Sequence, residues 1–415
     1  MRTAMRAAAA VTGSALVCVA LPVTPAAAAP DVASSVPPPS RSTFVRQVGE
    51  VLAAGVPGVN IETRDERGTQ SIVAGVGDLR THEPPRPSGQ FRIGSVTKSF
   101  TATLVLSLAA DERIHLDAPI DRYLPGVLPY SEPITVRQLL QHRSGLFDYG
   151  TVLWATPELV ARSRHRDYAP AELVRIATRK PLPFAPGSEF LYSNTDYVVL
   201  GMLVEKVTGD SYARQLSQRV LEPAGLRHTY PPGHDPRLRR PSARGYEAVH
   251  SSTRLTDLTT YNMSVAWASG DIVSTTHDLN RFYSALLGGN LVPRTLLHQM
   301  QQTEAAFPGF EYGLGLGYIE MCGQQVWGHV GGVPGYGTYS FISPQNARQI
   351  TISVNRGLTL NQAAEDAINA IIANQFCGHP SRDALVRPSP HAAAGRPPQT
   401  VPSRRVSGRT TLVVL

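Results

Sequence analysis

Three short segments of the chain combine residue types that could carry out nucleophilic catalysis. In the first segment, Ser95 precedes Lys98 by three residues, so the two side chains would share one face of a helix. A serine hydroxyl becomes a good nucleophile when a nearby base removes its proton, and burial lowers the pKa of a lysine. The apolar neighbours Phe91, Phe100 and Leu104 favour such burial. The segment predicts a serine nucleophile with a lysine base, although a helix cap beside a solvated lysine has the same pattern.

The second segment follows a Pro186-Gly187 turn and leads into an expected helix. Tyr192 would lie at the edge of this turn, where a phenol beside a cationic amine can lose its proton and act as a general base. Asn194 could offer its amide to the carbonyl group of a substrate. Taken alone, the segment is more typical of an ordinary helix cap, so its role depends on its neighbours in the fold.

The third segment is an expected strand that contains His329, Gly331 and Gly332. Glycines in a strand let another backbone approach closely, and an edge strand can hold an extended peptide. We therefore expect both glycines to bound the substrate site, with the Gly332 N–H as an oxyanion donor beside the helix N-terminus that carries Ser95. His329 would be a polar group next to the nucleophile, although a lone histidine is usually structural.

The elements that must position these segments can be read from the spacing of apolar and turn residues. Together they predict an α+β protein in which an antiparallel sheet is covered by N- and C-terminal helices, with a helical domain inserted between the strands at about residues 115–270. Helices are predicted over residues 42–54, 95–111, 135–146, 193–208 and 361–376. Strands are predicted over residues 58–63, 71–76, 314–319, 325–330, 337–343 and 349–355.

The two ends of the chain differ from the body in composition. Residues 1–29 combine a positive start, an apolar stretch and a run of alanines, which predicts a secretory signal peptide; a membrane anchor is the alternative. Residues 30–40 are expected to be a flexible linker before a domain at 41–377. Residues 378–415 are rich in Arg and Pro and predict a disordered tail. We expect a secreted protein, with the tail as a potential contact to the anionic cell wall.

Charge and cysteine usage fit this interpretation. The net charge is +7, of which the signal contributes +2 and the last 38 residues +5, so the body is close to neutral. No basic stripe indicates a nucleic-acid partner. Without the signal, the chain retains Cys322 and Cys377, which could form one disulfide in an oxidising compartment or remain as two buried thiols.

The three segments, in this order, resemble the SxxK, YxN and HxG/KTG motifs of the penicillin-binding/β-lactamase-like serine hydrolases. The separations of 97 and 137 residues (192 − 95 and 329 − 192) are similar to those of the class C β-lactamase and secreted D-alanyl-D-alanine carboxypeptidase branch, peptidase family S12. Further similar stretches are ITVRQLLQHRSGL, PGSEFLYSNTDYVVLGMLVEKVTG, YGLGLGY and GHVGGVPGYGTYSF. The resemblance covers about residues 42–377.

This resemblance implies a mechanism. Ser95 would attack an amide or ester carbonyl to form an acyl-enzyme, with Lys98 and Tyr192 moving the proton to the leaving group. The backbone N–H groups of Ser95 and Gly332 would hold the oxyanion, and Asn194 would contact the substrate. The resemblance implies no metal and no cofactor. The expected partner is a small peptide, β-lactam or ester; we expect no nucleic acid, no membrane span and a monomer.

Two positions depart from the carboxypeptidase pattern. Close carboxypeptidase relatives have a hydroxyl residue in the middle of the third motif and an arginine after the GLGL stretch, whereas this chain has Val330 and Gly317. Arg244 could replace the missing partner for a substrate carboxylate. A D-alanyl-D-alanine carboxypeptidase-like activity stays the first expectation. The alternatives are a D-aminopeptidase, amidase, endopeptidase or esterase, a true β-lactamase, and an inactive penicillin-fold binding module.

Overall fold

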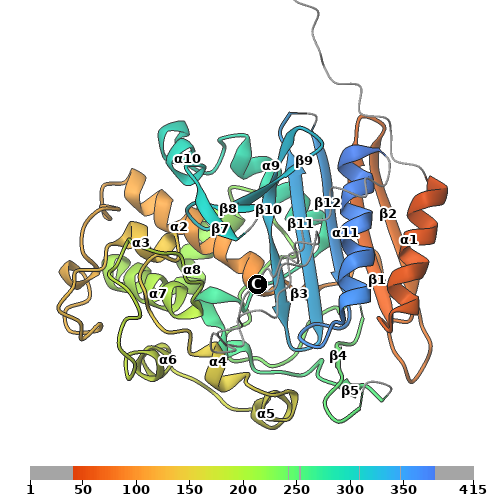
Figure 1. Cartoon of the computed structure of the whole chain (residues 1–415), viewed down its shortest axis with the longest axis horizontal. Helices are drawn as coiled ribbons and strands as arrows, with labels where there is room; N and C mark the ends of the chain where they lie inside the picture. The colour runs from red at the N-terminus through yellow and green to blue at the C-terminus, as the bar shows by residue number, and fades with distance from the viewer. Residues whose placement is uncertain (1–40, 242, 252–253, 308, 346, 379–415) are drawn as a thin grey trace, which may run out of the picture. The chain divides into compact units, whose positions relative to one another are not determined.

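A computed structural model describes residues 41–241, 243–251, 254–307, 309–345 and 347–378. Within these ranges, an eight-stranded antiparallel sheet runs in the order β2-β1-β12-β11-β10-β9-β8-β7 (Figure 1). Strands that are distant in the chain therefore become neighbours, as where β1 pairs with β12. The strands are β1 (Gly58–Asp65), β2 (Gly68–Gly75), β7 (Glu304–Phe307), β8 (Phe310–Tyr312), β9 (Gly317–Met321), β10 (Gln324–Val333), β11 (Tyr336–Ser343) and β12 (Arg348–Val354).

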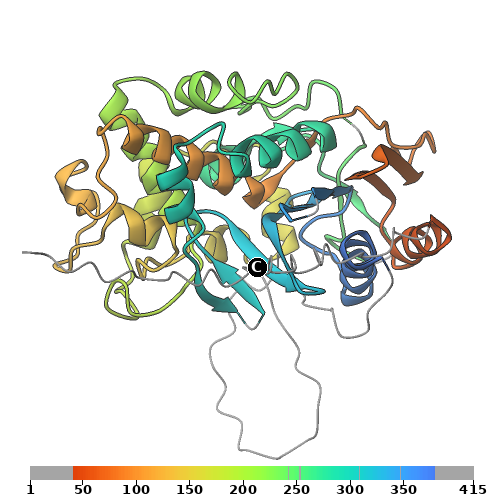
Figure 2. The ribbon, with the colours of Figure 1, turned by 90° about the horizontal axis from the view of Figure 1, so that it is seen from above.

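Helices cover both faces of this sheet. The first and last helices, α1 (Arg41–Ala53) and α11 (Gln362–Cys377), pack together on one face. On the other face, α9 (Thr276–Leu287) packs on β11 and β12, as the view from above shows (Figure 2). Because β11 and β12 are buried along their whole length, the sheet is an inner layer between two helical layers.

The segment between β2 and β7 supplies most of the remaining helices. They pack into a second core, separate from the core beneath α1 and α11. The longer helices are α2 (Thr97–Ala110), α3 (Val136–Leu140), α4 (Gly150–Leu153), α5 (Pro157–Ser163), α6 (Pro170–Ala177), α7 (Asn194–Thr208), α8 (Tyr212–Leu216) and α10 (Arg294–Met300). The short turns are η1 (Gly94–Val96), η2 (Ile120–Arg122), η3 (Ser217–Leu221), η4 (Met263–Val265) and η5 (Trp267–Ser269). Two small two-stranded sheets pair β3 (Phe91–Arg92) with β6 (Val273–Ser274), and β4 (Tyr246–Glu247) with β5 (Thr256–Asp257).

The α+β class and the antiparallel sheet covered by the N- and C-terminal helices are confirmed. Two element predictions were too long. The helix predicted over 135–146 is only α3, because His142 has a positive φ of 57° that an α-helix does not accommodate. The strand predicted over 314–319 begins at Gly317, after Gly315 with a φ of +71°. The strands β7 and β8, which complete the sheet, were missed.

Cys322 and Cys377 form a disulfide with a Cα–Cα distance of 5.7 Å, so the open question of their pairing is settled in favour of the bond. It joins the turn between β9 and β10 to the end of α11. The expected signal peptide at 1–29, the linker at 30–40 and the tail from residue 379 lie outside the described residues.

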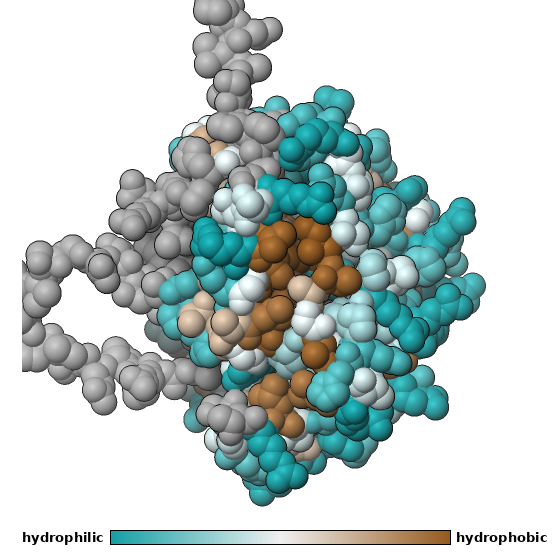
Figure 3. Space-filling view, turned by 90° about the vertical axis from the view of Figure 1, so that its right-hand side faces the viewer, coloured by the Kyte–Doolittle hydropathy of each residue, from teal (hydrophilic) through white to brown (hydrophobic). Residues whose placement is uncertain are grey.

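Apolar side chains gather on one face of the described body. Figure 3 shows it on the side that carries α1 and the edge strand β2. There Val45 is 62% exposed, and Ile72, Val73 and Ala74 of β2 are half-buried. Among the described helices, none combines the length and the apolar character that crossing a bilayer requires.

Candidate active site

Ser95 and Lys98 meet at the start of α2, a helix that is buried along most of its length. Ser95 lies in the turn η1, and Lys98 lies in the first turn of α2 with no exposed surface. Lys98 Nζ is 3.0 Å from Ser95 Oγ, the proximity that the i, i+3 spacing predicts. The backbone turns sharply just before them, at Gly94, which has a positive φ of 55°. The hydroxyl and the amine are therefore held together by the helix itself.

The amine of Lys98 has two further neighbours, both carbonyl oxygens. Nζ donates to Asn194 Oδ1 at 2.8 Å and to the backbone oxygen of Ser269 at 3.0 Å. A neutral amine has two N–H groups and one lone pair. The two carbonyl oxygens take both N–H groups, so the lone pair is left for the proton of Ser95.

Burial makes the neutral form of this lysine accessible. Loss of hydration lowers the pKa of Lys98 to about 7, although the charges of Asp148 and Asp196 partly raise it. A general base is most effective when its pKa is near the working pH. Lys98 is therefore suited to accept the Ser95 proton at neutral pH.

The amide of Asn194 is fixed at the start of α7. Its Nδ2 donates to Asp148 Oδ2 at 3.1 Å and Oδ1 at 3.3 Å, while its oxygen faces Lys98. Asp148 also accepts from the backbone N–H of Gly150 at 2.9 Å. The amide nitrogen thus faces Asp148, whereas the sequence analysis expected it to face a substrate carbonyl. Asn194 links a buried carboxyl group to the catalytic amine.

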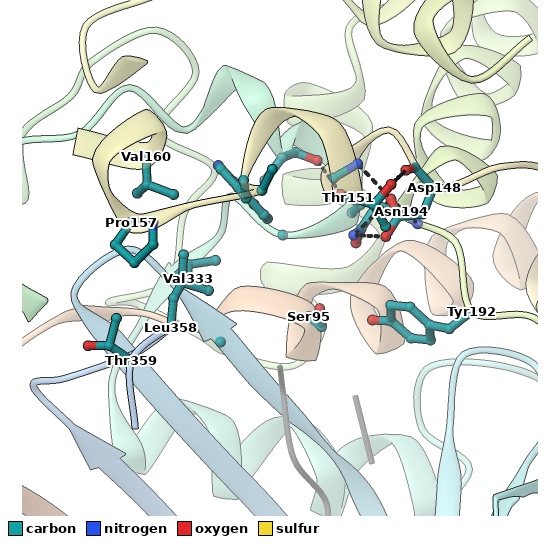
Figure 4. A pocket seen from close by; sticks show the side chains of 17 residues that line it. Ser95, Asp148, Thr151, Pro157, Val160, Tyr192, Asn194, Val333, Leu358 and Thr359 are labelled. Carbon is teal, nitrogen blue, oxygen red and sulfur yellow. Dashed lines mark hydrogen bonds between the residues drawn. The ribbon is translucent and has the colours of Figure 1, made fainter. Parts of the chain in front are cut away.

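Tyr192 lies on the side of Ser95 away from Val160 and Val333, and its phenol group points toward Ser95 (Figure 4). The centre of its ring is 4.6 Å from Lys98 Nζ. Burial raises the pKa of Tyr192 well above its usual value, and the nearby Ser95 hydroxyl lowers it only in part. The phenol therefore keeps its proton and is a proton donor, in contrast to the phenolate base that the sequence suggested.

A buried pair behind Tyr192 holds its loop. The ring of His142 lies 4.1 Å from the Tyr192 ring between centres, and the backbone oxygen of His142 accepts the N–H of Leu191 at 2.8 Å. His142 Nδ1 is 2.8 Å from Asp196 Oδ2. Burial lowers the pKa of His142 and raises the pKa of Asp196. Burial therefore favours the neutral form of both groups, and the His142 ring places no full charge behind the phenol.

The two glycines of β10 contact the nucleophile through their backbone. A Cβ atom on Gly331 would lie 2.0 Å from the Ile93 oxygen and 2.9 Å from the Ser95 nitrogen, and one on Gly94 would lie 2.9 Å from the Gly332 nitrogen. Only glycine permits this approach. The N–H groups of Ser95 and Gly332 are thereby brought to one place, where they could hold an oxyanion.

His329 and Val330, which flank the glycines on β10, do not line the cavity. His329 is buried against Tyr312, with its Nε2 3.2 Å from the phenol oxygen, and burial lowers its pKa to about 3. Val330 packs in the core beneath α1 and α11. Val330 therefore does not select an uncharged substrate end by direct contact.

Ser95 opens into a cavity of about 210 Å³. Its far end is apolar, and Figure 4 shows Pro157, Val160, Val333 and Leu358 there, on the side of Ser95 away from Tyr192. In the described ranges, no group of three or more His, Cys, Asp or Glu side chains is placed to hold a metal ion. The lining residues are Ser95, Asp148, Gly150, Thr151, Trp154, Ala155, Pro157, Val160, Tyr192, Asn194, Ala266, Ser269, Gly270, Gly332, Val333, Leu358 and Thr359.

Sequence reasoning missed two groups of site residues. Asp148 comes shortly after the stretch ITVRQLLQHRSGL, which was noted only for its resemblance, and an acidic residue there was the available signal. Ser269 contributes a backbone oxygen, and the apolar end combines residues of α5, β10 and the loop after β12, which are distant in the chain. Neither of these leaves a residue pattern that could have been recognised.

Comparisons with known proteins show what the chain is similar to. Residues 43–375 match the family model described as Beta-lactamase. Penicillin-binding protein 4* of Bacillus subtilis (strain 168) is 29% identical over 278 residues, which is 64% of this chain and 60% of that protein. The matches to three curated relatives span 41% to 60% of those proteins' own length.

Two solved structures cover almost the whole of their own chains. A D-stereospecific amidohydrolase from Streptomyces sp. has 33% sequence identity and a TM-score of 0.74, covering 82% of this chain and 99% of the other. The D-amino acid amidase from Ochrobactrum anthropi SV3, complexed with D-phenylalanine, has 27% identity and a TM-score of 0.72, covering 81% and 97%.

Proposed function

The chain belongs to the Beta-lactamase family of serine hydrolases, and we propose that it cleaves amides and esters of D-amino acids whose leaving group carries no free carboxylate. The observation that carries this proposal is the composition of the cavity wall. Of the described residues that line the cavity, none is Arg, Lys or His, and the one ionisable acid is Asp148. A carboxylate bound there would have no cationic partner, and an unpaired buried charge is costly. The similarity to a D-stereospecific amidohydrolase and a D-amino acid amidase supports the same class of substrate.

The proposed reaction begins with proton transfer from Ser95 Oγ to the neutral amine of Lys98. The oxygen then attacks the carbonyl carbon, and the N–H groups of Ser95 and Gly332 stabilise the oxyanion. Tyr192 gives its phenol proton to the leaving amine or alcohol and regains a proton from Lys98. The acyl-enzyme is hydrolysed by water, which restores the Ser95 hydroxyl. Because Tyr192 lies on one side of Ser95 and the apolar end on the other, the apolar end receives the acyl group (Figure 4).

A D-alanyl-D-alanine carboxypeptidase activity is the second candidate, favoured by the similarity to a penicillin-binding protein. It requires a partner for the C-terminal carboxylate. Arg244, the substitute that the sequence suggested, pairs with Asp257 at 2.5 Å and does not line the cavity. The amidase proposal is therefore preferred.

A matched substrate panel tests this choice. We expect purified protein to hydrolyse D-phenylalanine amide and D-phenylalanine methyl ester at least about tenfold better than a D-alanyl-D-alanine peptide with a free carboxylate. The same peptide as its C-terminal amide separates the effect of charge from the effect of length. Preferential cleavage of the free acid would establish the carboxypeptidase, and equal cleavage of D- and L-phenylalanine amides would contradict the stereochemical part.

We also propose that the protein is exported, on the basis of the signal-like residues 1–29. The Cys322–Cys377 disulfide supports this because such bonds persist in oxidising compartments. N-terminal sequencing of protein recovered from the culture medium of an expressing bacterium should give a terminus at residue 28 or 29. Retention of the full N-terminus inside the cell would contradict export.

A further inference from the structure

Glu247 is a buried carboxyl group that plays no part in the proposed reaction. It is 1% exposed and does not line the cavity. It lies at the end of the two-residue strand β4, within a loop-rich segment. A buried carboxylate requires hydrogen-bond donors, and the donors it has here all belong to two loops beside the cavity.

The first loop follows β12. Glu247 Oε1 accepts the N–H groups of Gly357 at 3.2 Å and Leu358 at 2.7 Å. Its Oε2 accepts the N–H and the hydroxyl of Thr359 at 2.8 Å and 2.6 Å. Leu358 and Thr359 form part of the cavity wall at its apolar end. One side chain therefore fixes the backbone of this wall.

The second loop is the turn between β10 and β11. Glu247 Oε1 also accepts the N–H of Gly335 at 2.8 Å. This turn directly follows Gly332, the proposed oxyanion donor, and Val333, which lines the apolar end. The two loops touch each other: a Cβ atom on Gly357 would lie 2.1 Å from the Val333 oxygen. Glu247 joins the two loops at this contact.

We propose that Glu247 is a positioning residue that sets the width of the acyl end of the cavity and thereby determines which acyl groups the enzyme prefers. It acts through Leu358 and Val333 rather than by touching substrate. This inference rests on the proposed function only in assigning the apolar end to the acyl group.

The test uses two esters with the same leaving group, p-nitrophenyl hexanoate and p-nitrophenyl acetate, so that the ratio of their kcat/KM values reports on the acyl end. In Glu247→Gln, the amide presents N–H groups to backbone donors and the two loops separate. We expect the hexanoate-to-acetate ratio to fall about tenfold, because a displaced wall loses its contact with the longer chain. The double variant with Leu358→Ala should show no further loss beyond Leu358→Ala alone, since both changes remove the same contact.

Glu62→Gln is the matched control. Glu62 is also buried, but it bonds to Asn280 and does not line the cavity. Its replacement should lower the melting temperature and leave the ratio unchanged. An unchanged or increased ratio in Glu247→Gln would overturn the proposal, as would an equal fall for both esters.

A second variant and a substrate comparison distinguish failure of this proposal from failure of the proposed function. If Glu247→Gln does not fold, Thr359→Val takes its place, because it removes one donor to Glu247 at nearly constant volume. This variant should lower the hexanoate-to-acetate ratio about threefold. A native ratio in Thr359→Val would also overturn the proposal. Hydrolysis of both esters without any cleavage of D-amino acid amides would contradict the proposed substrate class while leaving the role of Glu247 testable.

Discussion

The two ends of the cavity are built by different means. Around Ser95, the reactive end places Lys98, Asn194 and Asp148 in one hydrogen-bonded chain, on or beside the helices α2 and α7. The acyl end has only apolar surface and one hydroxyl, supplied by α5, the end of β10 and the loop after β12. Ser95 and Lys98 lie in η1 and the first turn of α2, and Asn194 begins α7 directly after the loop of Tyr192, whereas the acyl end draws its surface from three segments that are distant in the chain.

This difference has an energetic reason. Proton transfer from Ser95 to Lys98 requires that their atoms stay within hydrogen-bond distance, and a helix holds such a distance better than a loop does. Apolar recognition tolerates small shifts, because its free energy depends on buried area rather than on direction. The reactive end should therefore respond to substitutions with large losses of rate, and the acyl end with modest changes of preference.

The largest effect is expected at the nucleophile. Ser95→Ala should lower kcat at least about 10³-fold, because no other group can form the acyl-enzyme. A fluorophosphonate probe, which bonds to Oγ with loss of fluoride, should increase the intact mass of the native protein and not of the variant. Ser107→Ala, in the same helix but away from the cavity, is the control and should react normally. An unchanged adduct in Ser95→Ala would show that Ser95 is not the nucleophile of the reactive end.

The next effect concerns the pH dependence. With a pKa of about 7, Lys98 is protonated at lower pH and cannot accept the Ser95 proton. The kcat/KM for an uncharged ester should therefore rise about tenfold per pH unit up to about pH 7 and then level off. Lys98→Arg, which stays cationic, should be inactive across the whole range. A profile that is flat between pH 5 and pH 7 would contradict the role of the lysine as base.

The same division explains what could be predicted from the sequence. Ser95 and Lys98 were predicted as a pair from their spacing at the start of a helix, whereas Tyr192 and Asn194 were assigned to the site by the resemblance of the three segments, in their order, to a known family. The sheet and its terminal helices were predicted from apolar periodicity. The spacing and the periodicity are local in the chain, and the helices and strands preserve them.

The remaining features depend on contacts that leave no local pattern. Glu247 acts on loops about 90 and 110 residues further along the chain. Val330 was expected near the substrate, but the alternation of side chains along β10 directs it to the opposite core. The phenol of Tyr192 was expected to ionise, whereas its burial, which only the fold determines, keeps it protonated.

A smaller effect is expected at the support of the reactive end. Asp148→Asn removes a charge that raises the pKa of Lys98, so the midpoint of the rising pH profile should move to lower pH. It also places an amide against the Asn194 amide, and we expect kcat to fall about 10- to 100-fold. Asp117→Asn makes the same change of net charge at the exposed ion pair with Arg137 and should leave the profile in place. A midpoint that stays or moves upward in Asp148→Asn would show that this carboxyl group does not act on Lys98.

The smallest effect is expected at the acyl end itself. Val160→Ala removes apolar surface from the cavity wall, which in a hydrophobic pocket is worth about tenfold or less in kcat/KM. We expect a three- to tenfold loss for D-phenylalanine amide and no measurable loss for D-alanine amide, whose methyl group does not reach this wall. Val152→Ala is the matched control, because Val152 is 44% exposed and does not line the cavity. An equal loss for both amides would mean that Val160 supports the reactive end. The two ends of the cavity would then not act separately at Val160, the residue for which we expect the most selective change of substrate preference.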